Sequence, residues 1–228
     1  MKDIQLGSSL LRLQSVPMTW KQLLSLLVLV VAGAAASHLL QSARPIGHDV
    51  SDTAAAGQIL RGKGSLHALK GAADVTLVVF TDYQCPACRK SNPAMQAAVA
   101  QDGNVRIVYK DWPIFGARSE RAAEVALASQ HQGIYASVHH SLMSSRSFDE
   151  AALRQVVERE GGSWRQLQVD LARHKHSIAT RLAQNRQEAF SLGLQGTPGY
   201  LIGPFLIEGA LTKREFLRAF AQARANRL

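Results

Sequence analysis

Cysteine is scarce in this chain. Only Cys85 and Cys88 occur among its 228 residues, whereas a secreted domain held together by disulfides usually carries about four or more cysteines at wider spacing. A disulfide between cysteines so close in sequence closes almost no loop, so it adds little stability through chain entropy. These observations make a purely structural disulfide a weak explanation for the pair.

A second cysteine pair is missing, and this weakens zinc binding as an explanation. Zinc sites use the Cys-x-x-Cys spacing, but they need two further ligands. The histidines that could supply them lie in amphipathic helical patterns, where an exposed histidine is the simpler interpretation: His139, His140, His174 and His176. We therefore predict no metal site.

Aromatic residues are also few, at 6% of the chain, and no stretch interleaves them with basic residues. The formal net charge of +9 is spread over helical segments that also contain acidic residues, as on a solvated face. We therefore predict no nucleic-acid partner. The apolar fraction of 46% is typical of a globular domain with a core.

A long apolar run stands near the N-terminus. From Leu23 to Ala36 only Ser25 is polar, and Lys21 precedes the run. This length is short for a spanning helix and suits a signal peptide, whereas the long segment before it favours an uncleaved anchor. Residues 1–40 are therefore predicted to be a signal anchor or a signal peptide. In both cases the domain is exported and its cysteines meet an oxidising compartment.

The cysteines fall within a predicted β-α-β unit. Residues 41–73, rich in Ala, Gly and Ser, are predicted to be a linker before it. The β-branched run Val75–Phe80 predicts a buried strand, and a helix is expected to begin at Pro86, because proline suits the first helical position. Residues 104–110 alternate like a second strand. The cysteines therefore lie at the turn from the first strand into the helix.

The second half of the chain begins with a helical block. Residues 117–192 have helical patterns, and a capping box of Ser147 and Glu150 is predicted inside them. The stretch "GYLIGPFLIEG" then predicts two strands around a Gly-Pro turn, and Thr212 with Glu215 predicts a capping box before a final helix. Residues 74–228 are thus an α/β domain with the order β-α-β, helices, β-β, α.

The position of Cys85 favours redox chemistry. It falls at the N-terminal end of a helix, where unpaired N–H groups and the helix dipole lower the pKa of a thiol. Cys88 lies one turn later, close enough to form a disulfide with Cys85. Pro86 and Ala87 between them carry no charge, so backbone amides must provide most of the stabilisation of a thiolate.

A distant motif, "GTPGY", points to the same chemistry. It places Thr197-Pro198 just before the third strand, where a proline requires a special turn, often with a cis peptide bond. An ordinary turn at a strand entry is the alternative. That alternative weakens when the motif is combined with a strand, the sequence CPAC and a helix.

These stretches together resemble the DsbA-type thiol–disulfide oxidoreductases, particularly the membrane-tethered or periplasmic bacterial members. The resemblance is carried by "VTLVVFTDYQCPACRK", "YKDWPIFGARSERAAEVALA" and "LGLQGTPGYLIG", and it covers residues 74–228. It implies a thioredoxin fold with an all-helical insertion at about 117–192, and no cofactor other than a redox-active Cys85–Cys88 disulfide.

The resemblance also implies roles for individual residues. Cys85 would be the exposed nucleophile, and Cys88 the buried resolving thiol. Pro198 would be a cis-proline packed against the disulfide, and the backbone of Thr197 would pair with an extended substrate.

The sequence departs from the family pattern at two positions. Many relatives have a buried acidic residue at the position of Val79, which passes a proton to the resolving cysteine. Asp82 is a candidate for this task here, although a role in the turn is the simpler interpretation. Ala87 stands where the strongest oxidants have histidine, so we expect a less oxidising potential than that of DsbA, about −120 mV.

We therefore expect an exported thiol–disulfide oxidoreductase that acts on cysteine-containing exported proteins as oxidant, isomerase or reductant. It would lie in the bacterial periplasm, anchored to the inner membrane, with a redox partner there. The alternative is a tethered, non-catalytic thioredoxin-like module that binds peptides or acts as a chaperone.

Overall fold

The structure is a computed structural model that describes residues 19–43, 45–62, 65–67 and 73–226. Two compact units divide at residues 44 and 45. The first contains helix α1 (Trp20–Ala43), which includes the predicted apolar run. Within the described residues, only the window Trp20–Ser37 is long and apolar enough to cross a membrane, and a signal sequence meets the same criteria.

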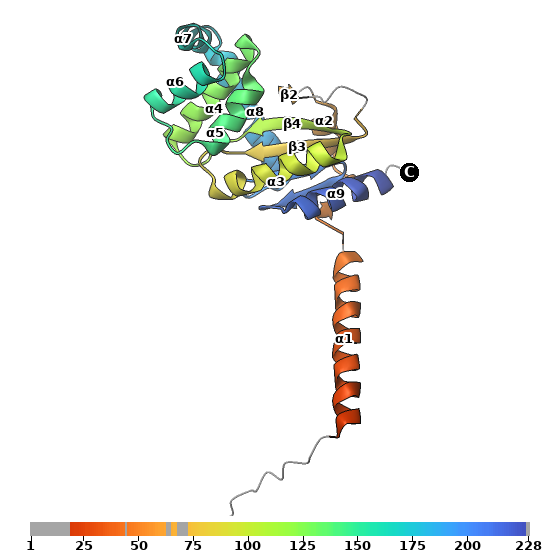
Figure 1. Ribbon diagram of the computed structural model, residues 1–228. Coiled ribbons are helices and arrows are strands. Elements are labelled where there is room, and N and C mark those ends of the chain that lie inside the picture. The colour runs from red at the N-terminus through yellow and green to blue at the C-terminus, as the bar shows by residue number, and fades with distance from the viewer. Residues whose placement is uncertain (1–18, 44, 63–64, 68–72, 227–228) are drawn as a thin grey trace, which may run out of the picture. The chain divides into compact units, whose positions relative to one another are not determined.

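The second unit is built around a six-stranded mixed sheet with the order β1-β6-β5-β3-β4-β2. Strands β3 (Val75–Thr81) and β4 (Val105–Asp111) are parallel and joined by helix α3 (Pro86–Asp102), as the sequence predicts. Strands β5 (Gly199–Ile202) and β6 (Phe205–Glu208) form an antiparallel hairpin beside β3. Figure 1 shows α3 running across this sheet, with helix α9 next to it.

The sheet is covered on both faces because its central strand is apolar on both sides. Leu77 and Val79 pack into a core with residues of α3 and of α9 (Lys213–Ala225). Val78 and Phe80 point to the opposite face, into a core shared with α2 (Ala54–Arg61) and α8 (Lys175–Ser191). The result is a layered helix–sheet–helix domain with β3 at its centre.

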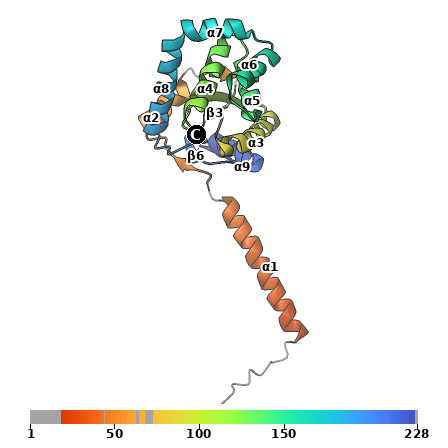
Figure 2. The same cartoon turned by 90° about the vertical axis from the view of Figure 1, so that its left-hand side faces the viewer.

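The predicted helical insertion is present between the two halves of the domain. It contains α4 (Ala117–Ser129), a 3₁₀ turn, η1 (Gln130–Gln132), α5 (Tyr135–Ser144), α6 (Glu150–Arg159), α7 (Trp164–Arg173) and α8. Figure 2 shows these helices gathered together at one end of the domain. The predicted α/β class and thioredoxin fold with a helical insertion are confirmed.

The helix starts show one correct and one wrong capping prediction. Thr212 and Glu215 form the predicted capping box at the start of α9. Helix α6, however, is capped by Asp149, whose side chain accepts a hydrogen bond from Ala152 N. Ser147 instead donates its hydroxyl to the Asp149 carboxylate. Asp149, which directly precedes the helix, therefore takes the capping position that was predicted for Ser147.

The prediction of a linker over 41–73 is wrong for most of that segment. Strand β1 (His48–Asp49) pairs with β6, strand β2 (Ser65–His67) pairs with β4, and α2 lies between them in the sequence. Ile59 of α2 is buried in the core that contains Val78 and Phe80. Residues 45–62 and 65–67 therefore belong to the folded domain, because apolar side chains of α2 help to complete one of the two cores. Residues 44, 63–64 and 68–72 lie outside the described residues.

Candidate active site

The two cysteines lie where β3 turns into α3. Cys85 is the residue that caps the helix, and Pro86 is its first residue. The Cys85 N–H donates to Asp82 O at 3.2 Å, and the Cys85 sulfur accepts the backbone N–H of Cys88 at an N···S distance of 3.4 Å. Both cysteines are free thiols in this structure. The helix start thus directs a backbone donor at the Cys85 sulfur, as expected from the sequence.

The fold brings the distant Thr197-Pro198 motif against this helix start. The peptide bond between these two residues is cis, and they directly precede β5, which pairs with β3. The Cys85 thiol donates to the Thr197 carbonyl oxygen at 3.2 Å. Residues that are 112 positions apart in the sequence therefore form one site.

The two thiols have opposite pKa shifts. The pKa of Cys85 is lowered to about 6, mainly by its hydrogen bond with Cys88, with help from Thr197 and from backbone N–H groups, while burial opposes the shift. The pKa of Cys88 is raised far above that of an ordinary thiol by the same hydrogen bond and by burial. At neutral pH the pair therefore consists of a Cys85 thiolate and a Cys88 thiol.

The expectation of an exposed nucleophile needs correction. Cys85 is only 2% exposed and Cys88 only 3%. Cys85 is covered because the Thr197-Pro198 segment lies against its sulfur. Neither thiol is openly exposed, so the accessible surface does not separate an exposed nucleophile from a buried resolving thiol.

Asp82 holds the turn together through its side chain. Its buried carboxylate accepts hydrogen bonds from four donors in the cysteine turn, the loop before α4 and α4 itself: Gln84 N at 2.7 Å, Ile114 N at 2.6 Å, Phe115 N at 3.1 Å and the Ser119 hydroxyl. These bonds connect the turn before Cys85 to the start of α4. Of the two roles considered for Asp82, the geometry favours the one in the turn.

A buried polar network beside this turn was not predicted. Tyr83 and Tyr135 donate their hydroxyls to the two carboxylate oxygens of Asp111, at 2.8 and 2.9 Å. Burial raises the pKa of Asp111 to about 6. His139 Nδ1 lies 3.0 Å from the Tyr83 hydroxyl, and this histidine is 1% exposed, so the expectation that it is exposed on its helix is wrong.

This network joins β4, the cysteine turn and helix α5. Its members come from separate elements and share no spacing rule. Asp111 is one of three charged residues in β4, so its position in the sequence does not single it out. Among the described residues, no three His, Cys, Asp or Glu side chains are grouped so that they could hold a metal ion.

Comparison with known proteins gives one family match. Residues 76–221, more than half of the chain, match the model of the DSBA-like thioredoxin domain. The chain is also similar to two Na⁺/H⁺ antiporters, one of them NhaA 3 of Salinispora tropica, to which it is 29% identical over 166 residues. That match covers 67% of this chain and 24% of the antiporter, so the chain spans about a quarter of that relative's length.

Solved structures agree with the family match. A thioredoxin-like oxidoreductase from Silicibacter pomeroyi is 32% identical with a TM-score of 0.69, covering 74% of this chain and 97% of that one. A periplasmic thioredoxin-like protein from Salmonella enterica is 26% identical with a TM-score of 0.67, covering 76% and 98%. The thiol-disulfide exchange protein α-DsbA2 from Wolbachia pipientis is 25% identical with a TM-score of 0.63, covering 66% and 82%.

Proposed function

This chain belongs to the DSBA-like thioredoxin domain family, and on that basis we propose that it is an exported thiol–disulfide oxidoreductase. It exchanges disulfides with the cysteines of other proteins through Cys85 and Cys88. The observation that carries this proposal is the Cys85 sulfur, which accepts the Cys88 N–H and contacts the Thr197 carbonyl beside a cis-proline. The cofactor-free chemistry resides in the cysteine pair itself.

In the oxidising direction, a substrate thiolate attacks the Cys85 sulfur of the Cys85–Cys88 disulfide. The S–S bond breaks, Cys88 leaves as a thiolate that takes up a proton, and a mixed disulfide forms between Cys85 and the substrate. A second substrate thiolate then attacks the substrate sulfur, and the Cys85 thiolate leaves. The low pKa of Cys85 favours this last step, because a thiol of lower pKa is a better leaving group.

The reverse sequence reduces a substrate disulfide, and a cycle of both shuffles disulfides. The reduction potential decides among these directions. Ala87 places no imidazole or charge between the cysteines, so we expect a potential below the value of about −120 mV that DsbA has. During exchange, the Thr197 backbone pairs with the extended substrate, and Pro198, buried beside it, keeps this segment against the sulfur.

Export and anchoring form a separate part of the proposal. The apolar helix α1 supports a signal anchor or signal peptide within residues 1–40. We place the domain in the bacterial periplasm, tethered to the inner membrane. Its partners are cysteine-containing exported proteins and a redox protein that regenerates the cysteine pair.

The proposal is tested with two matched cysteine variants. Cys85→Ser should abolish both the reduction of insulin and the oxidation of a reduced model protein, because no sulfur remains for the first exchange. Cys88→Ala should instead accumulate a mixed disulfide with the substrate, visible on a non-reducing gel, since the resolving thiol is gone. A non-catalytic binding module predicts no trapped complex and no effect of Cys85→Ser, and that result would overturn the proposal.

A further inference from the structure

A small basic cavity is lined in part by the two residues that flank the cysteine motif in the sequence, Gln84 and Arg89. It has a volume of about 200 Å³ and is lined by Gln84, Arg89, Arg118, Arg146, Ser147 and Phe148. Gln84 precedes Cys85, and Arg89 lies in the first turns of the same helix. The three arginines come from α3, α4 and the loop between α5 and α6. No carboxylate is among the lining residues, so the cavity is strongly positive.

Arg89 is fixed in place and keeps its charge uncompensated. Its Nε donates to Met143 O at 3.2 Å, its Nη2 donates to Ser145 O, and its guanidinium lies 5.8 Å from the centre of the Phe148 ring. These partners are carbonyl oxygens and an aromatic face. They hold the side chain without neutralising it, since none of them carries a full negative charge.

The other two arginines are exposed and available to a ligand. Arg118 and Arg146 make no side-chain hydrogen bond or ion pair that meets ordinary distance limits within the described residues. The pKa of Asp149 is lowered mainly by the hydrogen bonds that this carboxylate accepts at the start of α6. The charge of Arg118 nearby adds a smaller lowering effect. Two guanidinium groups therefore face one small space.

Gln84 adds an unused donor to the residues that line this space. Its Nε2 atom is buried and has no hydrogen-bond partner among the described residues, although buried amide groups are nearly always hydrogen-bonded in folded proteins. A ligand oxygen in the cavity would satisfy this group. Together with the arginines, the amide provides the donors that a carboxylate requires.

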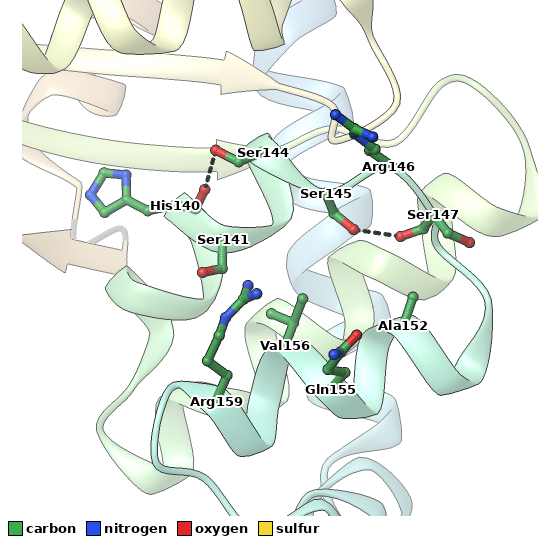
Figure 3. A pocket seen from close by; sticks show the side chains of 10 residues that line it. All are labelled: His140, Ser141, Ser144, Ser145, Arg146, Ser147, Ala152, Gln155, Val156 and Arg159. Atoms are coloured by element: carbon green, nitrogen blue, oxygen red, sulfur yellow. Dashed lines mark hydrogen bonds between the residues drawn. The ribbon is translucent and has the colours of Figure 1, made fainter.

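A second hollow continues from this cavity along the insertion. It has a volume of about 580 Å³, lies between α5 and α6, and shares Arg146 and Ser147 with the cavity. Figure 3 shows Arg159 reaching from α6 toward Ser141 on α5, with Arg146 at the other end. Arg159 has a carboxylate neighbour, Glu160, at 3.5 Å. Hydroxyl groups line much of the rest.

We propose that these two hollows bind an acidic segment of a polypeptide substrate, with a carboxylate next to the reacting cysteine held by Arg118, Arg146 and Gln84. This inference rests on the proposed function and adds a preference to it. The continuation between α5 and α6 favours a polypeptide over a small carboxylate such as glutathione, because a small molecule would leave the larger hollow empty. The site would thus select cysteines that have acidic neighbours.

The test uses peptides whose single cysteine carries a 2-thiopyridyl group, flanked by either glutamate or glutamine. The Cys85 thiolate attacks the peptide sulfur and releases 2-thiopyridone, which is measured by absorbance. Cys88 then attacks Cys85, forms the Cys85–Cys88 disulfide and releases the peptide thiol. The full chain is compared with the double variant Arg118→Gln/Arg146→Gln and with Arg165→Gln/Arg173→Gln, which removes the same charge from exposed positions on α7.

We expect the wild-type chain to react with the glutamate peptide at least about threefold faster than with the glutamine peptide, as partly exposed ion pairs allow. The ratio should fall toward one in Arg118→Gln/Arg146→Gln and at high salt, and persist in Arg165→Gln/Arg173→Gln. Equal rates for the two peptides in the wild type, or a ratio that both double variants change alike, would overturn the inference.

A second pair of substrates tests whether the site binds a small molecule instead of a polypeptide. This pair is oxidised glutathione, which carries carboxylates, and hydroxyethyl disulfide, which is neutral. If the arginine variants affect only the preference for glutathione, the site binds a small molecule and the inference is wrong. If neither peptide reacts with the wild-type chain, the proposed oxidoreductase function itself fails.

Discussion

At the scale of single residues, the two sulfurs differ because their neighbours differ. Cys85 receives a backbone N–H from the start of α3 and lies against the Thr197 carbonyl. The pKa of Cys88 is raised, so this thiol keeps its proton, because it is hydrogen-bonded to the Cys85 sulfur and buried. The nearby Asp82 carboxylate accepts hydrogen bonds from the cysteine turn, from the loop before α4 and from Ser119 of α4. The asymmetry of the pair therefore comes from position along one helix turn.

The pKa of Cys85 leads to a prediction for its reactivity. Alkylation of the reduced domain by iodoacetamide should rise with pH and reach half its plateau rate near pH 6, the pKa of the folded thiol. An unperturbed cysteine would give a midpoint near about 8.5, and such a value would contradict the geometry of the site.

The same shift affects stability. The pKa of Cys85 is lower in the folded than in the unfolded chain, so between these two values the unfolded chain binds the additional proton. The free energy of unfolding of the reduced domain should therefore rise with pH over this range, and the contribution is lost as the pH falls through about 6. Denaturant titrations at several pH values measure this slope, and the oxidised domain, which has no Cys85 thiol, is the control.

Some of these residues could be found from the sequence and others could not. Cys85, Cys88, Thr197 and Pro198 belong to short motifs whose spacing or local backbone requirement is visible in the chain. The network around Asp111 depends on side chains that meet only after the insertion packs on β4. The burial of Cys85 likewise depends on a segment 112 positions away.

At the scale of elements, the sequence predicts those helices and strands that have a long apolar pattern and clear signals at their ends. Strand β3 is a continuous β-branched run, and α3 begins at a proline and ends at Gly103 in a left-handed conformation. Strands β1 and β2 have two and three residues, too few to show any alternation. Helix α2 has eight residues rich in alanine and glycine, which is why its segment resembled a linker.

Helix α2 provides a test of where the folded domain begins. Ile59 is 3% exposed, so Ile59→Ala should lower the free energy of unfolding by roughly 2–4 kcal/mol through lost burial and a cavity. Gln58→Ala, one position earlier on the exposed side of the helix, should change it by less than about 0.5 kcal/mol. Denaturant unfolding measures both. Equal, small effects would mean that α2 does not belong to the cooperative core.

At the scale of the whole molecule, an apolar helix precedes one α/β domain. Helix α1 carries no acidic residue in its first turn and no basic residue in its last. The domain has two cores on the two faces of one sheet. This organisation agrees with the proposal that the domain carries the redox chemistry and the N-terminal segment decides its place in the cell.

The fate of the apolar helix can be measured directly. When the full chain is expressed in a Gram-negative bacterium, we expect it to stay in the membrane fraction after alkaline carbonate washing, because the helix is retained as an anchor. Intact mass measurement of the purified protein should then include the N-terminal residues. A soluble periplasmic product that begins shortly after the three alanines at 34–36 would instead identify a cleaved signal peptide.

The two very short outer strands have a consequence for how the domain associates with other chains. An extended chain can add itself to a long, free strand edge and so start aggregation. Here β1 and β2 form the edges of the sheet and offer only two and three residues. The described edges thus offer little template for unwanted sheet growth. Under the proposed function, the loop before β5 is then left as the place where a substrate strand aligns.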